Sequence, residues 1–468
     1  MATQAKKSSF SGGLGFVLAA AGSAVGVGNI WRFPTLAAKH GGGLFLIVYL
    51  ILVLTFGFSL LMTDIAIGRK TGKSSLDAFK TINKKWSFLG KLTFAVPSII
   101  ITYYVVIGGW ILKYMVSSVT EFTATANSDY FINFITSKTP PVVWMLVFLA
   151  ITAFIVYCGV EKGIERFSKI IMPALFILIL GISIFSLSTK KTDENGQIRT
   201  GIQGLLVYIK PDFTGLTFKG FMSVLLDAMS QLFFSLSVAM GIMITYGSYV
   251  KKDVDLNKSV AQIEIFDTIV AFLAGLMVVP AVYVFMGTEG MKAGPGLIFQ
   301  SLPQVFNAMG FAGRIIGPAF FVMVAFAALT SSVSIMEAIV GACMETFKSS
   351  RKKISIIITI IAAAAAVVVC LGYNVLSFGV TLPTGATGQN LLDVLDYVSN
   401  SLLMPVISLL TCIVIGWVVK PKWVIDEVES SGAKFGRKKL YTVMIKYIAP
   451  ALMALLFLQS IGAFNFLG

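Results

Sequence analysis

The sequence predicts an all-α membrane protein with eleven transmembrane helices, arranged as two five-helix inverted repeats with broken first and sixth helices. Composition is the first observation: 56% of the 468 residues are hydrophobic and only 13% are charged, whereas soluble domains have about a quarter charged residues. The second is run length. The apolar runs are about twenty residues long, as membrane helices require, and the strands of a β-barrel are about half that length.

Eleven apolar segments follow one another along the chain: 12–37, 42–68, 90–119, 141–158, 166–187, 220–248, 259–286, 312–346, 354–372, 391–419 and 440–464. They predict five regions: a cytoplasmic N-terminus (1–11), a first five-helix repeat (12–187), an extracellular loop (188–219), a second, inverted five-helix repeat (220–419), and a cytoplasmic loop with the eleventh helix (420–468). Because each half has an odd number of spans, the second half must have inverted topology.

The distribution of basic residues sets the orientation. With the N-terminus inside, 26 of the 37 Lys and Arg residues lie in inner loops and 9 in outer loops, and Arg32 and Lys113 lie within spans. This bias fits the positive-inside rule. We therefore expect a multi-pass protein of a bacterial plasma membrane with a cytoplasmic N-terminus and an extracellular C-terminus. The net charge of +15 belongs to these loops and does not indicate nucleic-acid binding.

Histidine and cysteine chemistry is not expected. His40 is the only histidine, and Cys158, Cys343, Cys370 and Cys412 have no zinc or CxxC spacing, so they are interpreted as small core thiols. No cleavable signal peptide is evident, because Asn29, Arg32 and Pro34 interrupt the first apolar run.

Two spans are poorly suited to face lipid. The segment 21–34 has three glycines at mid-span followed by Asn29, Arg32 and Pro34, and the segment 230–241 carries several hydroxyl and amide side chains. They open the two predicted halves, and paired broken helices indicate a midplane binding site in transporters. An unwound turn offers free N–H groups to an anion and free carbonyls to a cation. The alternative is close helix packing through small residues.

Polar groups inside other predicted spans are further candidates for the midplane binding site. The hydroxyls of Thr330 and Ser331 could be hard-oxygen ligands for Na⁺, or they could bond locally to the preceding backbone turn. Asp267, inside the seventh span, is costly unless it meets a cation, although it could be a paired structural residue. Arg32 and Asp396, near the outer ends of their spans, could pair as a gate or extend separately towards water.

Taken in order, these motifs resemble the neurotransmitter:sodium symporters. The resemblance rests on the run 24–34 followed by Gly41 to Gly43, and on Tyr103-Tyr104, Gly163 to Glu165, Gln231 to Ser237, Ile244 to Tyr246, Leu329 to Ser332, Asp393 and Asp396. It covers nearly the whole chain at the family's spacing. The chain is similar to a bacterial eleven-helix subset of amino-acid transporters that lacks the twelfth span.

The resemblance implies a binding site for an amino acid and two sodium ions. The implied sodium ligands are Ala24, Asn29, Ser235 and Asp267 at the first site and Gly22, Val25, Ala327, Thr330 and Ser331 at the second. The implied substrate-binding residues are Ser23, Ala24, Val27, Gly28, Ile100, Tyr104, Phe234, Ser235, Ser237, Met240, Ser334 and Ile335. The Val27 and Gly28 amides and the Tyr104 hydroxyl would bind the substrate carboxylate. Phe234 and Tyr104 would cap the pocket.

Two gates are also implied. Arg32 would face Asp396 on the outer side, and Lys7 would pair with Glu345 near Tyr249 and Ser248 on the inner side. Three residues depart from the family pattern. Many relatives have Asn at the position of Asp267, Arg at Lys7, and glycine at Ala239. Lysine lacks the bidentate fork of arginine, so the inner gate is expected to be weaker, and Ala239 is expected to narrow the pocket.

The function expected from this resemblance is sodium-coupled import of a neutral, hydrophobic or aromatic amino acid by alternating access, with no enzymatic activity. Chloride is not expected, because Ala271 stands where chloride-dependent relatives need a hydroxyl and Asp267 supplies a fixed negative charge instead. That carboxylate could also carry a proton outward after sodium leaves. The alternatives are a non-transporting membrane amino-acid sensor and, less favoured, an ion channel. The sequence does not indicate an oligomeric state.

Overall fold

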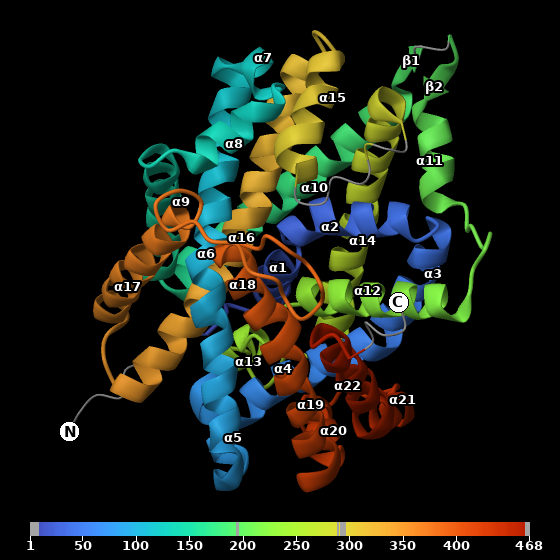
Figure 1. Cartoon of the computed structure of the whole chain (residues 1–468). Helices are drawn as coiled ribbons and strands as arrows, with labels where there is room; N and C mark the ends of the chain where they lie inside the picture. Colours follow the sequence, from blue (N-terminus) through green and yellow to red (C-terminus); the bar gives the residue numbers. More distant parts are fainter. Residues whose placement is uncertain (1–8, 193–195, 288–289, 291–295, 464–468) are drawn as a thin grey trace.

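The helices of this computed structural model form one bundle (Figure 1). The structure describes residues 9–192, 196–287, 290 and 296–463. The elements up to residue 200 are α1 (Gly13–Ala24), α2 (Val27–Lys39), α3 (Gly43–Leu52), the π-helical turn η1 (Val53–Gly57), α4 (Phe58–Thr71), α5 (Ser75–Ile82), the 3-10 turn η2 (Lys84–Trp86), α6 (Ser87–Thr120), α7 (Phe122–Thr125), α8 (Ser128–Thr136), α9 (Pro140–Tyr157), the π-helical turn η3 (Val160–Glu165), α10 (Arg166–Ser188), β1 (Lys190–Thr192) and β2 (Ile198–Thr200).

The remaining elements are also helical. They are α11 (Gly201–Ile209), α12 (Phe218–Ser235), α13 (Ile242–Gly247), α14 (Leu256–Met286), the π-helical turn η5 (Leu297–Ser301), α15 (Leu302–Ala308), α16 (Gly313–Phe347), α17 (Arg351–Leu371), α18 (Leu391–Asp396), η6 (Tyr397–Leu403), α19 (Met404–Ile413), η7 (Val414–Val418), α20 (Lys422–Glu429), α21 (Lys438–Val443), η8 (Met444–Ile448) and α22 (Ala449–Ser460), where η6, η7 and η8 are π-helical.

Helices occupy each of the eleven predicted apolar segments. Among the described residues, nine helical segments are long and apolar enough to cross a membrane, and the bent pair α1–α2 makes ten. The predicted sixth span, 220–248, is divided between α12, with 18 residues, and the six-residue α13. Neither α12 nor α13 is long and apolar enough to cross a membrane by itself, so the total of eleven spans stays a prediction.

The first broken helix is the α1–α2 pair. Its two parts meet at an angle of 53°, because the chain leaves helical geometry at Val25 (ψ 86°) and is extended at Gly26 (ψ −176°). The last carbonyls of α1 and the first amides of α2 therefore lack intrahelical partners. Because residues 19–24 at the end of α1 are all buried and α1 packs against α10, α14 and α16, these free groups lie inside the protein (Figure 1).

The second broken helix is α12–α13. Ser237, Ala239 and Gly241 have φ values of 53°, 60° and 71°, so left-handed residues interrupt the helix between its two parts. This conformation costs a residue with a Cβ about 1–2 kcal/mol. A hydrogen bond from the Ala239 amide to Asp64 Oδ2 on α4, 2.9 Å long, helps to hold the turn. The two breaks adjoin, since Ser237 Oγ lies 3.2 Å from both the hydroxyl and the carbonyl oxygen of Ser23.

Part of the predicted extracellular loop, 188–219, forms regular structure, at residues 190–192 and 198–209. β1 and β2 pair antiparallel, with Lys190 opposite Thr200, and a Thr200–Gln203 capping box starts α11. α11 packs on α14, where the Tyr208 hydroxyl donates to the Phe272 carbonyl across 3.2 Å. β1, β2 and α11 lie towards the same end of the bundle as α7, α8 and α15 (Figure 1).

Candidate functional site

A small cavity lies between the two helix breaks and α6 and α16. Its volume is about 20 Å³, and the residues that line it are Ser23, Ala24, Gly26, Asn29, Ile100, Tyr104, Phe234, Ser235, Ser237, Met240, Ile242, Ser331 and Ile335. Most of the substrate positions implied by the resemblance are therefore brought together here. Val27, Gly28 and Ser334 are not among the lining residues, and Gly26 and Ile242 are lining residues that the sequence did not indicate.

Phe234 closes this cavity on one side. A Cβ placed on Gly28 would lie only 2.9 Å from Phe234 Cε1, so the ring packs directly on the backbone of the α2 N-terminus. A volume of about 20 Å³ is enough for about one water molecule. An amino acid therefore requires the lining side chains to move, and Phe234 is the side chain whose displacement uncovers the Gly28 backbone.

The buried Tyr104 hydroxyl forms no hydrogen bond of ordinary geometry with a described residue, although it lies close to Ser331 and to the Val27 backbone. It lines the cavity and lies close to the extended turn, because a Cβ on Gly26 would be 3.7 Å from it. An unsatisfied buried hydroxyl costs about 1–3 kcal/mol. A carboxylate bound at the α2 N-terminus would satisfy it together with the free amides of that helix.

Asn29, Ser235 and Asp267 form a buried polar cluster beside the cavity. Asp267 Oδ1 accepts hydrogen bonds from Asn29 Nδ2 and Ser235 Oγ, both 2.7 Å long, and Ser235 Oγ lies 2.9 Å from Asn29 Oδ1. Asp267 is fully buried, and no ion pair to it is found in the described ranges.

The second oxygen of Asp267, Oδ2, and the hydroxyl of the neighbouring Tyr49 form no hydrogen bond of ordinary geometry with a described residue, although these two side chains lie close enough to interact with each other. A buried carboxylate without a cation is strongly unfavourable. The oxygen-rich donor set fits a hard monovalent cation such as Na⁺. Neighbouring Ala271 is buried and offers no hydroxyl.

The residues implied for the second sodium site also converge. Gly22 packs against Thr330, since a Cβ at Gly22 would lie 3.3 Å from Thr330 Cβ, and Ser331 Oγ donates to the Ser23 carbonyl across 3.2 Å. Thr330 Oγ1 lies 3.0 Å from the Ala327 carbonyl. The Thr330 hydroxyl therefore bonds to the preceding turn of its own helix, which was the alternative to sodium binding. The same side chain adjoins the end of α1. Within the described ranges no group of three His, Cys, Asp or Glu side chains could hold a metal.

Ala239 does not line the cavity, contrary to the expected narrowing. Its methyl group instead affects the backbone, because a residue with a Cβ must hold the left-handed φ of 60°.

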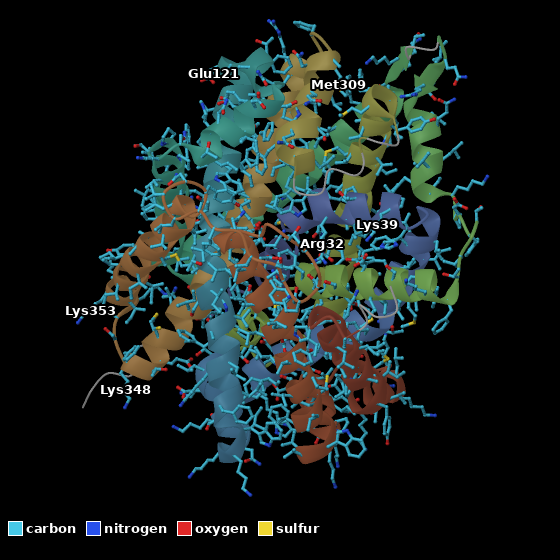
Figure 2. The ribbon with its side chains drawn as sticks, viewed as in Figure 1. Arg32, Lys39, Glu121, Met309, Lys348 and Lys353 are labelled. Carbon is cyan, nitrogen blue, oxygen red and sulfur yellow. The ribbon has the colours of Figure 1, made fainter. Side chains whose placement is uncertain are left out.

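The outer residues are arranged differently from the expected gate. Arg32 Nη2 donates to Ser230 Oγ across 2.8 Å, and Asp396 Oδ1 accepts from Asn400 Nδ2 across 2.6 Å. Arg32 and Asp396 form no ion pair in this structure. Arg32 lies in the centre of the bundle (Figure 2), where it lines a cavity of about 170 Å³ with Asp227 and Asn400. Pairing of Arg32 with Asp396 would therefore require this outer cavity to close.

The inner gate is only partly described, because Lys7 lies outside the described residues. Glu345 Oε2 accepts 2.9 Å hydrogen bonds from both the amide and the hydroxyl of Ser74. Ser248 Oγ donates to the Thr245 carbonyl, and the Tyr249 hydroxyl donates to Glu337 Oε1 across 2.8 Å rather than to Glu345.

Glu337 belongs to a buried network that the sequence reading missed. Arg351, at the start of α17, donates through Nη2 to Glu337 Oε1 across 2.8 Å, and the Glu337 side chain is fully buried. Through Tyr249, which lies in the turn after α13, this pair connects that turn to α16 and α17. Glu337 is a charged residue inside the eighth predicted span, as Asp267 is inside the seventh. The same signal could therefore have indicated this network.

Replacing Arg351 with methionine should therefore destabilise the protein by about 3–5 kcal/mol, because it leaves Glu337 charged, buried and unpaired. The measurement is thermal unfolding of the purified full-length protein, with Lys352→Met as the control for loss of a neighbouring charge. A loss of stability no larger than that of the control would show that the pair is not structural.

Neutralising the outer carboxylate with Asp396→Asn should reduce uptake about tenfold or more, because Arg32 then has no anion to meet when the outer cavity closes. Equilibrium binding of substrate should be partly retained. Initial uptake rates and binding are compared with those of Asp129→Asn, a change at an exposed outer position. Unaltered uptake would mean that the two residues do not act as a gate.

Comparison with known proteins gives consistent results. The family model described as "Sodium:neurotransmitter symporter family" matches residues 7–136 and 127–467. The chain is 33% identical over 461 residues to the uncharacterized sodium-dependent transporter YhdH of Bacillus subtilis, covering 97% of each chain. It is 32% identical to an uncharacterized sodium-dependent transporter of Methanocaldococcus jannaschii, covering 88% of this chain and 82% of that one.

More distant relatives and a solved structure agree. The sodium- and chloride-dependent GABA transporter 2 of Rattus norvegicus is 27% identical, with 73% of this chain and 64% of the transporter covered. The crystal structure of MhsT in complex with L-phenylalanine superimposes with a TM-score of 0.84 at 34% identity, covering 97% of this chain and 100% of that one.

Proposed function

This chain belongs to the sodium:neurotransmitter symporter family, and on that premise we propose that it couples sodium entry to import of a neutral, apolar amino acid without chloride. The family consists of sodium-dependent membrane transporters rather than enzymes. One observation carries the proposal. The buried Asn29–Ser235–Asp267 cluster lacks a cationic partner among the described residues and adjoins a cavity lined by two unwound helices.

Sodium coupling follows from the chemistry of this cluster. Asp267 brings a full negative charge into a fully buried position, and a sodium ion would remove that cost while accepting Oδ2 as a ligand. A substrate carboxylate beside the Ala24 carbonyl would add a further negative ligand. Sodium and substrate would then stabilise each other's binding, which is the thermodynamic basis of symport. We propose a second ion between the end of α1 and Thr330 and Ser331.

The lining of the cavity supports a neutral, apolar substrate. Ile100, Phe234, Met240, Ile242 and Ile335 contribute apolar surface, and none of the lining residues is charged. An acidic or basic substrate side chain would remain unpaired and buried there, at a cost of several kcal/mol. MhsT, whose structure resembles this one, was crystallised with L-phenylalanine. We therefore propose the same class of substrate, with flexible Met240 adapting to side chains of different size.

Alternating access would operate through the two breaks. The left-handed residues around Ala239 and the extended turn at Gly26 would act as hinges, because the regular hydrogen bonding of the helices is interrupted there. On the outer side, movement of Phe234 would open the substrate cavity to the cavity beneath Arg32, since Phe234 lines both. On the inner side, the bonds of Glu345 to Ser74 and of Tyr249 to Glu337 would have to loosen.

A competition panel tests substrate class. The full chain is reconstituted in proteoliposomes, and sodium-driven uptake of labelled phenylalanine is measured with each of the twenty amino acids in excess. Leucine, isoleucine, methionine and the aromatic amino acids should reduce uptake strongly. Dominant competition by lysine or glutamate would overturn the assignment of an apolar substrate.

A further inference from the structure

We propose that the groove between α6, α16 and α17 binds one anionic phospholipid, with its acyl chain in the groove and its headgroup at Lys353. The groove is the largest cavity described here, about 650 Å³, against about 20 Å³ at the substrate site. It is lined on α6 by Phe94 and Ile101, on α16 by Ile339, and on α17 by a longer row of residues.

The groove faces the membrane. All three helices are long and apolar enough to span a bilayer. Only 33% of an apolar 18-residue stretch of α17 is buried within the protein. Ile357 and Ile361 line the groove and are 40% and 59% exposed. With so few polar groups in its lining, the groove would be unfavourable to fill with water.

Its length fits a lipid of one leaflet. The lining residues on α17 run from Lys353 to Ala365, which is about 18 Å at 1.5 Å per residue. Half of the hydrocarbon core of a bilayer is about 15 Å thick. An acyl chain that begins at the level of Lys353 and extends through one leaflet therefore reaches the level of Ala365.

The charge at the mouth selects the headgroup. Lys353 is the only charged residue that lines the groove, it is exposed, and it forms no ion pair with another described residue. Its neighbours differ, because Arg351 is bound to Glu337 and Lys352 lies 5.5 Å from the ring centre of Tyr157. Lys348 and Lys353 lie at one end of the α16–α17 pair, far from Met309 (Figure 2). On the predicted orientation this end is cytoplasmic, where anionic lipids attract basic residues.

The lipid would contact the same two helices, α6 and α16, that line the substrate site. Ile101 and Thr102 line the groove and lie between Ile100 and Tyr104, which line the substrate cavity on the same helix. Ile339 lies one helical turn after Ile335 on α16. A bound acyl chain would therefore contact both helices that carry the pocket, α6 beside the residues that line the substrate cavity and α16 one turn further along the same face.

Native mass spectrometry of the full-length protein tests this proposal independently of transport. The purified protein is titrated with dioleoylphosphatidylglycerol or dioleoylphosphatidylcholine, and retained lipids are counted. We expect one tightly retained phosphatidylglycerol, preferred about fivefold over phosphatidylcholine, as one basic residue at the headgroup predicts. Lys353→Ala should abolish the preference, whereas Lys353→Arg and the neighbouring Lys352→Ala should keep it.

A second pair of variants tests the acyl-chain part of the groove. Ala365→Trp fills the groove and should lower retention of both lipids, whereas Ala364→Trp, on the exposed face of the same helix, should not. Equal retention of the two lipids by the wild type would overturn the proposal, as would identical behaviour of the Lys353→Ala and Lys352→Ala variants or unchanged retention in Ala365→Trp. A protein dimer that Ala365→Trp dissociates would also overturn it, because a second copy would then cover the groove.

Discussion

Removing two hydroxyls with Thr330→Ala and Ser331→Ala should abolish sodium-driven uptake while the protein still folds. Both side chains lie on α16 beside the end of α1, where Thr330 adjoins Gly22 and Ser331 bonds to the Ser23 carbonyl. A hydrogen bond or ligand contact to a charged group contributes about 1.5–3 kcal/mol. Loss of both should therefore reduce sodium affinity about a hundredfold or more.

The matched control for this double variant is Ser332→Ala. Ser332 is the next hydroxyl on α16, but it faces Thr152 across 3.1 Å and is not an expected sodium ligand. Sodium-dependent binding of labelled phenylalanine and thermal unfolding are measured for both proteins. A double variant that transports normally with unchanged sodium affinity would show that the second sodium site is wrongly assigned.

The Asp267→Asn variant should lose uptake in chloride-free medium, whereas the wild type should be fully active when gluconate replaces chloride. Asp267 is fully buried, and Asn29 and Ser235 hold one of its oxygens while the other forms no hydrogen bond of ordinary geometry with a described residue. The attraction between unit charges 4 Å apart is about 4 kcal/mol at an effective dielectric of 20. Sodium affinity should therefore fall about tenfold or more in Asp267→Asn.

Glu264→Gln is the control for this experiment, since it removes a buried carboxylate from the same helix one turn earlier. Uptake is measured in sodium gluconate and in sodium chloride for the three proteins. If chloride restores uptake by the Asp267→Asn variant, the Asp267 carboxylate takes the place of a bound chloride ion in the wild type. Loss of wild-type uptake in the absence of chloride would contradict the proposal. The same dependence of uptake on chloride in Glu264→Gln would also contradict it.

The helical segments could be predicted closely from the sequence, because hydropathy over about twenty residues is a strong signal in membrane proteins. The segment predicted at 42–68 is Gly43–Thr71 in the structure, and the one predicted at 391–419 is Leu391–Val418. The sixth span is the exception. Its apolar run continues through 236–241, where left-handed residues divide it. Hydropathy does not report backbone dihedral angles, although the polar residues around Ser237 indicated a break.

Much of the pocket was predicted from motifs, whereas the partners of charged residues were not. The roles of Asn29 and Tyr104 were implied by the resemblance of local motifs to the family, because such motifs are short stretches of sequence. Pairs between distant elements, such as Glu337 with Arg351, depend on how the helices pack. The bond from Arg32 to Ser230 depends also on the conformation of the outer cavity. Helix α11 packs against α14 inside the segment that was predicted as a loop, because its nine residues are too few to be recognised as an apolar span.

Sodium-gradient-driven accumulation is the most direct test of the proposed function. The full chain is reconstituted in proteoliposomes with potassium inside, and entry of labelled phenylalanine is followed after dilution into sodium or potassium gluconate. We predict accumulation above equilibrium in sodium, collapse of that accumulation when a sodium ionophore is added, and counterflow of label into substrate-loaded vesicles. Sodium-dependent binding without entry or counterflow would identify a sensor, and entry that is equal in sodium and potassium would contradict symport.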